Sequence, residues 1–321
     1  MQAAIRSQYG PPGVLTVETV ETPAPKDHEI LVRVFAATVN RTDCALLGAS
    51  PFIMRFVAGL FRPKLRITGT DFAGRVEAVG KNVTAFKPGD KVWGFDDIGL
   101  SSHAQYLTIP GNKAVLLMPE NVSFEAAAAS AEGAHYAINF VNKVTIKSGQ
   151  KVLVNGATGA IGSALVQILK HLGAHVTAVC DTKNLELVRS IGADEVLDYT
   201  KADFTQHDAT YDFIFDAVGK STFGRCRPLL NRRGIYISSE LGPWSQNLFL
   251  ALFTPLMSGK KVVFPLPVDI PKSLSFIKDL TEKGRFKPLI DRVYPLENIR
   301  EAYEYVAGGQ KTGNVVLRMV E

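Results

Sequence analysis

A glycine-rich turn in the segment VLVNGATGAIGSALVQIL constrains the fold of this chain more than any other feature. Gly156, Gly159 and Gly162 lie where a short apolar run, typical of a buried strand, gives way to helical periodicity. At such a turn the first amides of the helix point at a bound phosphate, and residues without a Cβ atom let it approach the backbone. The segment therefore predicts a nucleotide-binding turn; close packing of the helix on the strand is the alternative explanation.

The turn and the strands that follow it predict a set of cofactor contacts. Asp181 comes directly after the strand HVTAVC, where an acid accepts from the ribose 2′-hydroxyl and repels a 2′-phosphate, which favours NADH. Lys183 and Tyr199 lie at neighbouring strand ends and could hold a 2′-phosphate, which favours NADPH, so both cofactors stay open. The other expected cofactor-binding residues are Gly156, Thr158, Gly159, Ala160, Ile161, Gly162, Val218 and Asn314.

From Lys151 onward, short apolar strands alternate with helical segments. The expected strands are KVLVNG, HVTAVC, EVLDY, YDFIFDAVG, GIYISS and KVVFPLP. This alternation predicts the α/β class, with a doubly wound parallel sheet and right-handed crossovers. The N-terminal part has a different pattern, with β-branched and alternating segments such as EILVRVFAATV, and the closing NVVLRMV is similar to it.

Length and composition exclude several classes of protein. With 321 residues, the chain is long enough for two domains. The net charge of +5 is spread along the chain, so no basic stripe for nucleic acid is expected. Three cysteines without a CxxC pair indicate neither a disulfide framework nor a zinc knuckle and favour a reduced, cytoplasmic setting. No apolar run reaches the roughly 18 residues of a membrane span, and none resembles a signal peptide.

Two motifs in order, GTDFAGRVEAVGKNVTAFKPGDKVWGF and GQKVLVNGATGAIGSALVQ, resemble the medium-chain dehydrogenase/reductases. Within them the chain is similar to the zinc-free quinone oxidoreductase (zeta-crystallin-like) branch, and the segments ADEVLDYT and GNVVLRMV extend the resemblance over nearly the whole chain. The resemblance implies a GroES-like β domain of residues 1–123 and 268–321 and a Rossmann domain of residues 124–267. We also expect a homodimer.

Zinc-dependent members of that family use a Cys, a Gly-His-Glu turn and a second Cys as the frame of their metal site. Here Asn40 falls at the first position, Gly69-Thr70-Asp71 replaces the turn, and the third position falls near SAEGAHY, which has no Cys. Threonine and asparagine are poor zinc ligands, so the resemblance implies that this chain has no catalytic metal.

Chemistry without a metal requires an acceptor that is already electron-poor. Quinones and α,β-unsaturated carbonyls accept hydride and delocalise the charge on to oxygen, while the protein supplies positioning and a hydrogen-bond donor. By resemblance, Asn40 is a candidate donor beside the nicotinamide. Tyr136, in the segment GAHYA, is a candidate donor of a hydrogen bond or a proton, although solvent could supply the proton instead.

Two apolar stretches, residues 52–61 and 241–253, could frame a pocket for a bulky apolar substrate. Its expected lining residues are Phe52, Phe56 and Trp244. A dimer interface, ordinary core or contact with a membrane surface are the alternatives, the last because basic residues flank the first stretch.

The sequence thus favours an NAD(P)H-dependent reductase of quinones or enones. An alcohol or aldehyde dehydrogenase of the same superfamily, and a nucleotide-binding protein without catalysis, are the two alternatives.

Overall fold

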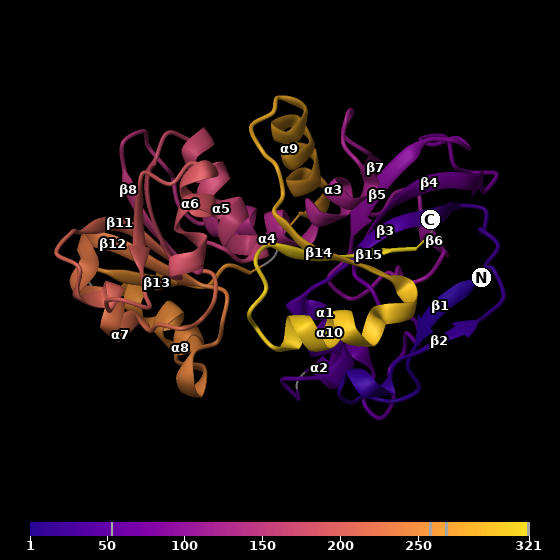
Figure 1. Cartoon of the computed structure of the whole chain (residues 1–321), viewed down its shortest axis with the longest axis horizontal. Coiled ribbons are helices and arrows are strands. Elements are labelled where there is room, and N and C mark those ends of the chain that lie inside the picture. Colours follow the sequence, from indigo (N-terminus) through magenta and orange to yellow (C-terminus); the bar gives the residue numbers. More distant parts are fainter. Residues whose placement is uncertain (53, 257–258, 267–268, 320–321) are drawn as a thin grey trace. The chain divides into compact units, whose positions relative to one another are not determined.

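The chain folds into two compact units (Figure 1). A computed structural model describes residues 1–52, 54–256, 259–266 and 269–319. Unit 1 comprises Met1–Glu132 and Asp269–Glu321, and unit 2 comprises Gly133–Val268. The first boundary follows Glu132, later than the start at residue 124 expected from the sequence, whereas the expected boundary at residues 267 and 268 lies outside the described residues.

Unit 1 is built on a seven-stranded sheet that uses both ends of the chain. Its strand order is β14-β15-β3-β4-β5-β7, and β6 pairs with β3. All pairings are antiparallel except that of β14 with β15, and a separate two-stranded ribbon joins β1 and β2. The strands are β1 (Gln2–Ile5), β2 (Thr16–Thr19), β3 (Glu29–Val39), β4 (Asp71–Val79), β5 (Lys91–Phe95), β6 (Tyr106–Pro110), β7 (Val115–Leu117), β14 (Ile290–Pro295) and β15 (Asn314–Arg318).

The helices of unit 1 are α1 (Arg41–Gly48), α2 (Met54–Ala58), α3 (Phe124–Ala129), α9 (Ile270–Glu282) and α10 (Ile299–Ala307). Helix α3 belongs to this unit because Phe124 stacks on Phe35 of β3, with ring centroids 4.5 Å apart. An ion pair of 3.0 Å between Glu125 and Arg318 of β15 adds a second link. The run of alanines at residues 126–129 favours a helix, but long-range contacts decide which unit this helix joins.

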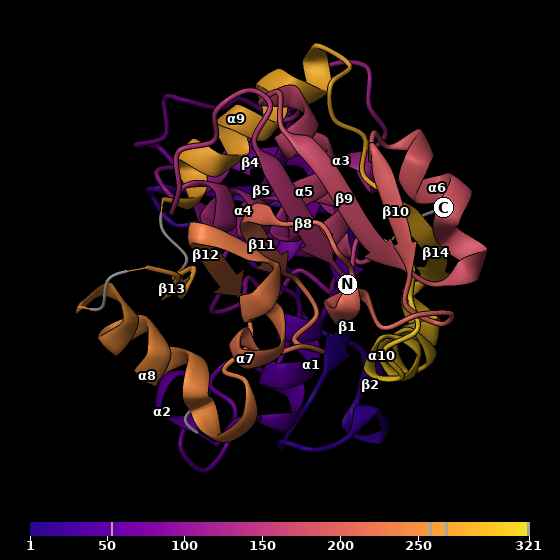
Figure 2. The same cartoon turned by 90° about the vertical axis from the view of Figure 1, so that its left-hand side faces the viewer.

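Unit 2 is a parallel sheet of six strands in the order β10-β9-β8-β11-β12-β13 (Figure 2). The chain builds outward from β8 through β9 and β10, then starts again beside β8 with β11, so the switch point lies between β8 and β11. Its elements are β8 (Lys151–Asn155), β9 (His175–Cys180), β10 (Glu195–Asp198), β11 (Tyr211–Asp216), β12 (Leu230–Ser238), β13 (Lys261–Val263), α5 (Ala160–His171), α6 (Leu185–Ser190), α7 (Phe223–Cys226), α8 (Gln246–Phe253) and α4 (Glu132–Val141), whose first residue belongs to unit 1.

The six strands expected after Lys151 are all present, and the α/β class is confirmed. Val152, Leu153 and Val154 of β8 are fully buried, as a central parallel strand covered on both faces requires. Among the described residues, no helix combines the length and the apolar character needed to cross a membrane.

Candidate active site

The glycine turn of unit 2 has the shape of a phosphate cradle. Gly159 is the N-cap of α5 and no side chain caps the first turn of this helix. Gly156 has φ +80°, and a Cβ atom on Gly162 would lie 2.0 Å from the carbonyl oxygen of Gly156. The turn is therefore closed to larger residues, and the first amides of α5 are available to an anion, which fits a dinucleotide pyrophosphate. Thr158, Ala160 and Ile161 are half-buried in the same turn.

Asp216 holds the neighbouring strand ends together. This buried carboxylate accepts hydrogen bonds from Asn155 Nδ2 at 3.0 Å, the Tyr236 hydroxyl at 2.8 Å and the Gly219 amide at 2.9 Å. The loop that it fixes brings Val218 against Gly156, where an added Cβ would lie 2.7 Å from Val218 Cβ. Sequence reasoning chose Val218 but missed Asp216; an acid at the end of the buried strand YDFIFD was the available signal.

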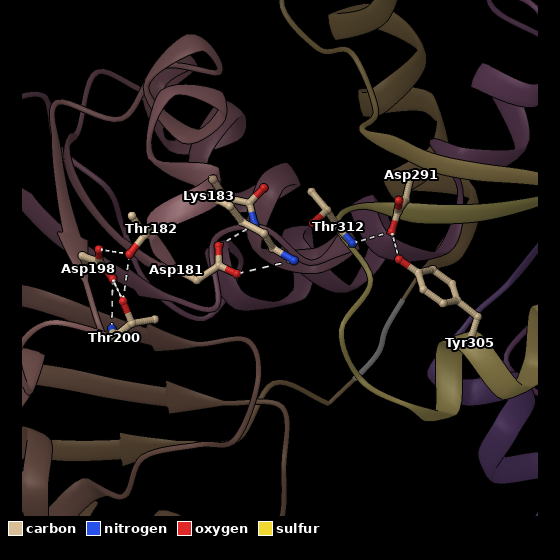
Figure 3. Close-up of polar contacts among 9 residues, drawn as sticks. Asp181, Thr182, Lys183, Asp198, Thr200, Asp291, Tyr305 and Thr312 are labelled. Carbon is tan, nitrogen blue, oxygen red and sulfur yellow. Dashed lines mark hydrogen bonds and ion pairs between the residues drawn. The ribbon is translucent and has the colours of Figure 1, made fainter.

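The two side chains expected to favour different cofactors are partners in the structure (Figure 3). Lys183 Nζ lies 3.7 Å from Asp181 Oδ2, and Asn184 Nδ2 donates to Asp181 Oδ1 at 2.6 Å. Lys183 thus offsets the negative charge of Asp181 at the end of β9. The amide of Tyr199 donates to the Cys180 carbonyl at 3.1 Å, while its ring is exposed.

The following loop is fixed by Asp198, which accepts from the hydroxyls of Thr182 and Thr200 at 2.5 and 2.6 Å (Figure 3). Sequence reasoning did not single out these three residues. The available signal was a threonine that closely follows a strand-end acid in each of the segments LDYT and CDTK.

Asn314, the expected cofactor residue of unit 1, begins β15. Its Nδ2 donates to the Leu289 carbonyl at 2.9 Å, while its buried Oδ1 has no hydrogen-bond partner within the part of the chain that the structure describes. The preceding loop is held by Asp291, which accepts from the Thr312 amide at 2.7 Å and the Tyr305 hydroxyl at 2.8 Å (Figure 3). Asn314 therefore keeps one acceptor available, and its contact with a cofactor stays a prediction.

A buried polar cluster surrounds Asn40 in unit 1. Asp71, the first residue of β4, accepts the Thr38 amide at 2.6 Å on Oδ1 and the Thr38 hydroxyl on Oδ2. Asn40 Nδ2 donates to Thr38 Oγ1 at 2.5 Å and lies 3.4 Å from Asp71 Oδ2. Because the single hydroxyl proton of Thr38 goes to Asp71, only the nitrogen of the Asn40 amide suits the position facing Thr38.

Glu132 completes the cluster from a distant part of the chain. Its Oε2 accepts from Asn40 Nδ2 at 3.1 Å and from the Thr70 hydroxyl at 2.9 Å. Asp43 Oδ2 accepts from the backbone N–H of Asn40 at 2.9 Å, and its Oδ1 is buried with no partner in the described chain. Asn40 and Thr70 therefore both donate to one carboxylate oxygen, Glu132 Oε2. The family resemblance implies that zinc-dependent relatives have metal ligands at these two positions.

Burial and mutual repulsion shift the pKa values of these groups. Desolvation and the charge of Glu132 raise the pKa of Asp71 to about 8, although the two Thr38 donors oppose the shift. Desolvation and Glu132 also raise the pKa of Asp43 well above its usual range, and desolvation raises that of Glu132 itself. Burial lowers the pKa of Lys311 to about 8 against the opposing charges of Glu132 and Asp291. Perturbed groups of this kind gather at sites of proton transfer.

Asn40 lies in a polar cluster, where its side-chain amide hydrogens already serve acceptors of its own unit, and its role as a donor beside the nicotinamide stays a prediction. Direct donation to a substrate would require one of these bonds to break. Sequence reasoning missed Glu132, Asp43 and Lys311. The signal for Glu132 was a single acid in an otherwise small and apolar stretch, AAAASAEGA.

The remaining expected site residues are less closely defined. Tyr136 is half-buried in α4, with its ring centroid 5.5 Å from that of His135. Phe52 and Phe56 meet edge to face at 6.2 Å, but their side chains are 63% and 67% exposed. Trp244, in unit 2, is 97% exposed. The catalytic role of Tyr136 and the pocket role of the three aromatics stay predictions. In the described chain, no three His, Cys, Asp or Glu side chains are arranged to hold a metal ion.

Comparison with known proteins agrees with the two-part architecture. Residues 26–120 match the alcohol dehydrogenase GroES-like domain, and residues 191–317 match the zinc-binding dehydrogenase family. A chloroplastic quinone-oxidoreductase homolog of Spinacia oleracea is 32% identical over 93% of this chain and 92% of its own length. The 2-methylene-furan-3-one reductase of Solanum lycopersicum is 30% identical over 100% of this chain and 79% of its own.

Solved structures show the same fold. The quinone oxidoreductase from Coxiella burnetii superimposes with a TM-score of 0.86 over 100% of this chain and 99% of its own, at 23% identity. With relatives of this identity and coverage, and with the glycine turn and the two-ended β unit described above, the chain belongs to the medium-chain dehydrogenase/reductase superfamily, in its quinone oxidoreductase-like branch.

Proposed function

We propose that this protein is an NAD(P)H-dependent reductase of quinones or α,β-unsaturated carbonyl compounds that works without a metal ion. The observation that carries the proposal is the convergence of Asn40 and Thr70 on Glu132 Oε2, at 3.1 and 2.9 Å. The Glu132 carboxylate accepts hydrogen bonds from Asn40 and Thr70. These are the two positions at which zinc-dependent relatives are expected to have metal ligands. The names of the relatives, which include quinone oxidoreductases and a 2-methylene-furan-3-one reductase, support the substrate class.

A bound nicotinamide nucleotide supplies the hydride in this reaction. The residues of this chain bind and orient it: the α5 amides and the glycines of the turn would hold the pyrophosphate, and Asp181 with Lys183 would hold the adenosine ribose. Because Lys183 lies 3.7 Å from Asp181 and offsets its charge, we infer that the site accepts both NADH and NADPH.

This inference on the cofactor is tested by titration of NADH and NADPH, followed by fluorescence, on paired variants. Asp181→Ser should gain affinity for NADPH, because the negative charge that repels a 2′-phosphate is removed. Lys183→Ala should lose affinity for NADPH and keep its affinity for NADH. If the original chain and both variants had identical affinities, neither side chain would contact the ribose or its 2′-phosphate.

Reduction of a quinone adds one hydride and one proton and gives a hydroquinone. The phenol of Tyr136 is the proposed donor of a hydrogen bond or of that proton. If so, Tyr136→Phe should lower kcat and remove a pH-dependent step from the rate profile while cofactor affinity is kept. An unchanged pH profile would assign the proton to another group or to solvent.

The reaction itself is tested with purified protein, NADH or NADPH, and a panel of quinones, enones and simple alcohols. We expect nucleotide oxidation with quinones or enones, unchanged after treatment with a chelator. Absence of turnover on the whole panel despite tight nucleotide binding would favour a non-catalytic role. Stoichiometric zinc in protein purified without chelator, with activity lost on its removal, would favour the alcohol dehydrogenase alternative.

A further inference from the structure

The stretch between Asp43 and Asp71 has an unusual charge pattern. It contains four basic residues, Arg55, Arg62, Lys64 and Arg66, and no acidic residue. It also carries three phenylalanines, although it lies outside the strands of the unit 1 sheet. A long run that combines cations with aromatic residues is typical of segments that meet a negatively charged, partly apolar surface.

The backbone of this stretch is well tied to the rest of unit 1. The Tyr9 hydroxyl donates to the Gly59 carbonyl at 2.6 Å, and the Arg6 amide donates to the Arg66 carbonyl at 2.8 Å. The Lys64 amide donates to the Ala58 carbonyl at 2.8 Å and closes a tight loop after α2. These hydrogen bonds hold the backbone of the loop in place.

Four side chains of this loop point to solvent. Leu60 and Phe61, at its tip, are 44% and 86% exposed, and the adjacent Arg62 and Lys64 are exposed as well. Phe52 and Phe56 of the preceding turn and helix are also exposed. Figure 1 shows α2 at an outer edge of unit 1. We name Phe52, Phe56, Leu60, Phe61, Arg62 and Lys64 the aromatic–basic patch.

We propose that the aromatic–basic patch docks this protein on the surface of an anionic lipid bilayer. Exposed aromatic and leucine side chains can enter the boundary between headgroups and acyl chains. The neighbouring cations then lie at the level of the acidic headgroups, each strengthening binding about fivefold. A second copy of the chain is a poorer occupant, because in a twofold contact the cations of one copy would face the same cations of the other and repel them.

Binding is measured with the full-length protein and vesicles of phosphatidylcholine alone or mixed with phosphatidylserine, by co-sedimentation. The first variant, Leu60→Ser with Phe61→Ser, removes the apolar tip, and the second, Arg62→Gln with Lys64→Gln, removes two charges. Phe249→Ser with Leu252→Ser is the matched control, because these side chains of α8 are 60% and 67% exposed but lie outside the patch. Thermal unfolding verifies that each variant is folded.

We expect binding to the phosphatidylserine vesicles that weakens in high salt. The tip variant should lose at least about tenfold in affinity, the charge variant about thirtyfold, and the control should bind as the original chain does. The proposal would be overturned by equal binding to uncharged vesicles, by no binding at all, or by patch variants that bind normally. Loss of self-association in the patch variants, without any vesicle binding, would assign the surface to a second copy. The assay needs no turnover, so its result is independent of the proposed reaction.

Discussion

Replacement of Asp71 by asparagine tests the reasoning about the buried carboxyl cluster. The substitution keeps the size of the side chain and the acceptor for the Thr38 amide, but it removes an ionisable group. In the original chain, the pKa of Asp71 is raised from 3.8 to about 8 by burial and by Glu132. Asp71 Oδ1 accepts from the Thr38 amide at 2.6 Å and Oδ2 accepts from the Thr38 hydroxyl, so a proton on either oxygen changes one of these two hydrogen bonds.

The sign and size of the effect follow from proton linkage. A carboxyl group whose pKa is higher in the folded chain than in the unfolded chain stabilises the fold fully below the unfolded pKa. That stability is lost as the pH rises through the folded pKa of about 8. Between the ordinary pKa of 3.8 and the folded pKa of about 8, each pH unit costs up to about 1.4 kcal/mol, so the whole window corresponds to roughly 6 kcal/mol as an upper bound.

The assay is urea unfolding of the original chain and Asp71→Asn from about pH 5 to about pH 8. The changed hydrogen bond to Thr38 shifts the free energy of unfolding of the variant by an amount that does not depend on pH, but only the original chain should lose stability through Asp71 as the pH rises. The free energy of unfolding of the variant should therefore increase relative to that of the original chain between about pH 5 and about pH 8. Asp198→Asn is the control: the pKa of this exposed carboxyl is lowered by Thr182 and Thr200, so its stabilising contribution disappears on acidification instead. If the free energies of unfolding of the original chain and Asp71→Asn differed by the same amount at every pH, the Thr38 donors would be keeping Asp71 ionised throughout.

Substitutions of Gly162 and Glu132 test the cradle and the cluster, with Gly224 as a control position. Gly162→Ala should lose nucleotide binding and about 1–3 kcal/mol of stability, because its Cβ would lie 2.0 Å from the Gly156 carbonyl oxygen, whereas Gly224→Ala, with its nearest neighbour at 4.0 Å, should be neutral in calorimetry and titration. Glu132→Gln should fold with little loss because an amide oxygen still accepts both donors, while Glu132→Leu should lose about 2–4 kcal/mol in urea unfolding because two buried donors are left unpaired. Equal losses for Gln and Leu would mean that the charge of Glu132, rather than its hydrogen bonds, stabilises the cluster.

The glycine turn could be recognised from sequence because all its determinants are local. The strand, the three glycines and the helix follow one another within residues 151–171, and the φ of +80° at Gly156 agrees with the residue type. The six strands of unit 2 were predictable for the same reason, since each contains a short local run of apolar or β-branched residues. The placement of α3 was not, because the stacking of Phe124 on Phe35 joins residues far apart in the chain.

The sequence by itself determined the class of fold, the position of the nucleotide-binding turn and the replacement of ligand-type residues at Asn40 and Thr70. Only the tertiary structure decided what these residues contact, because Glu132 reaches them from 92 and 62 positions away. It also decided the protonation of the cluster, since a raised carboxyl pKa arises from burial and from like charges brought together. The pairing of Asp181 with Lys183 likewise depends on side-chain positions that a motif does not specify.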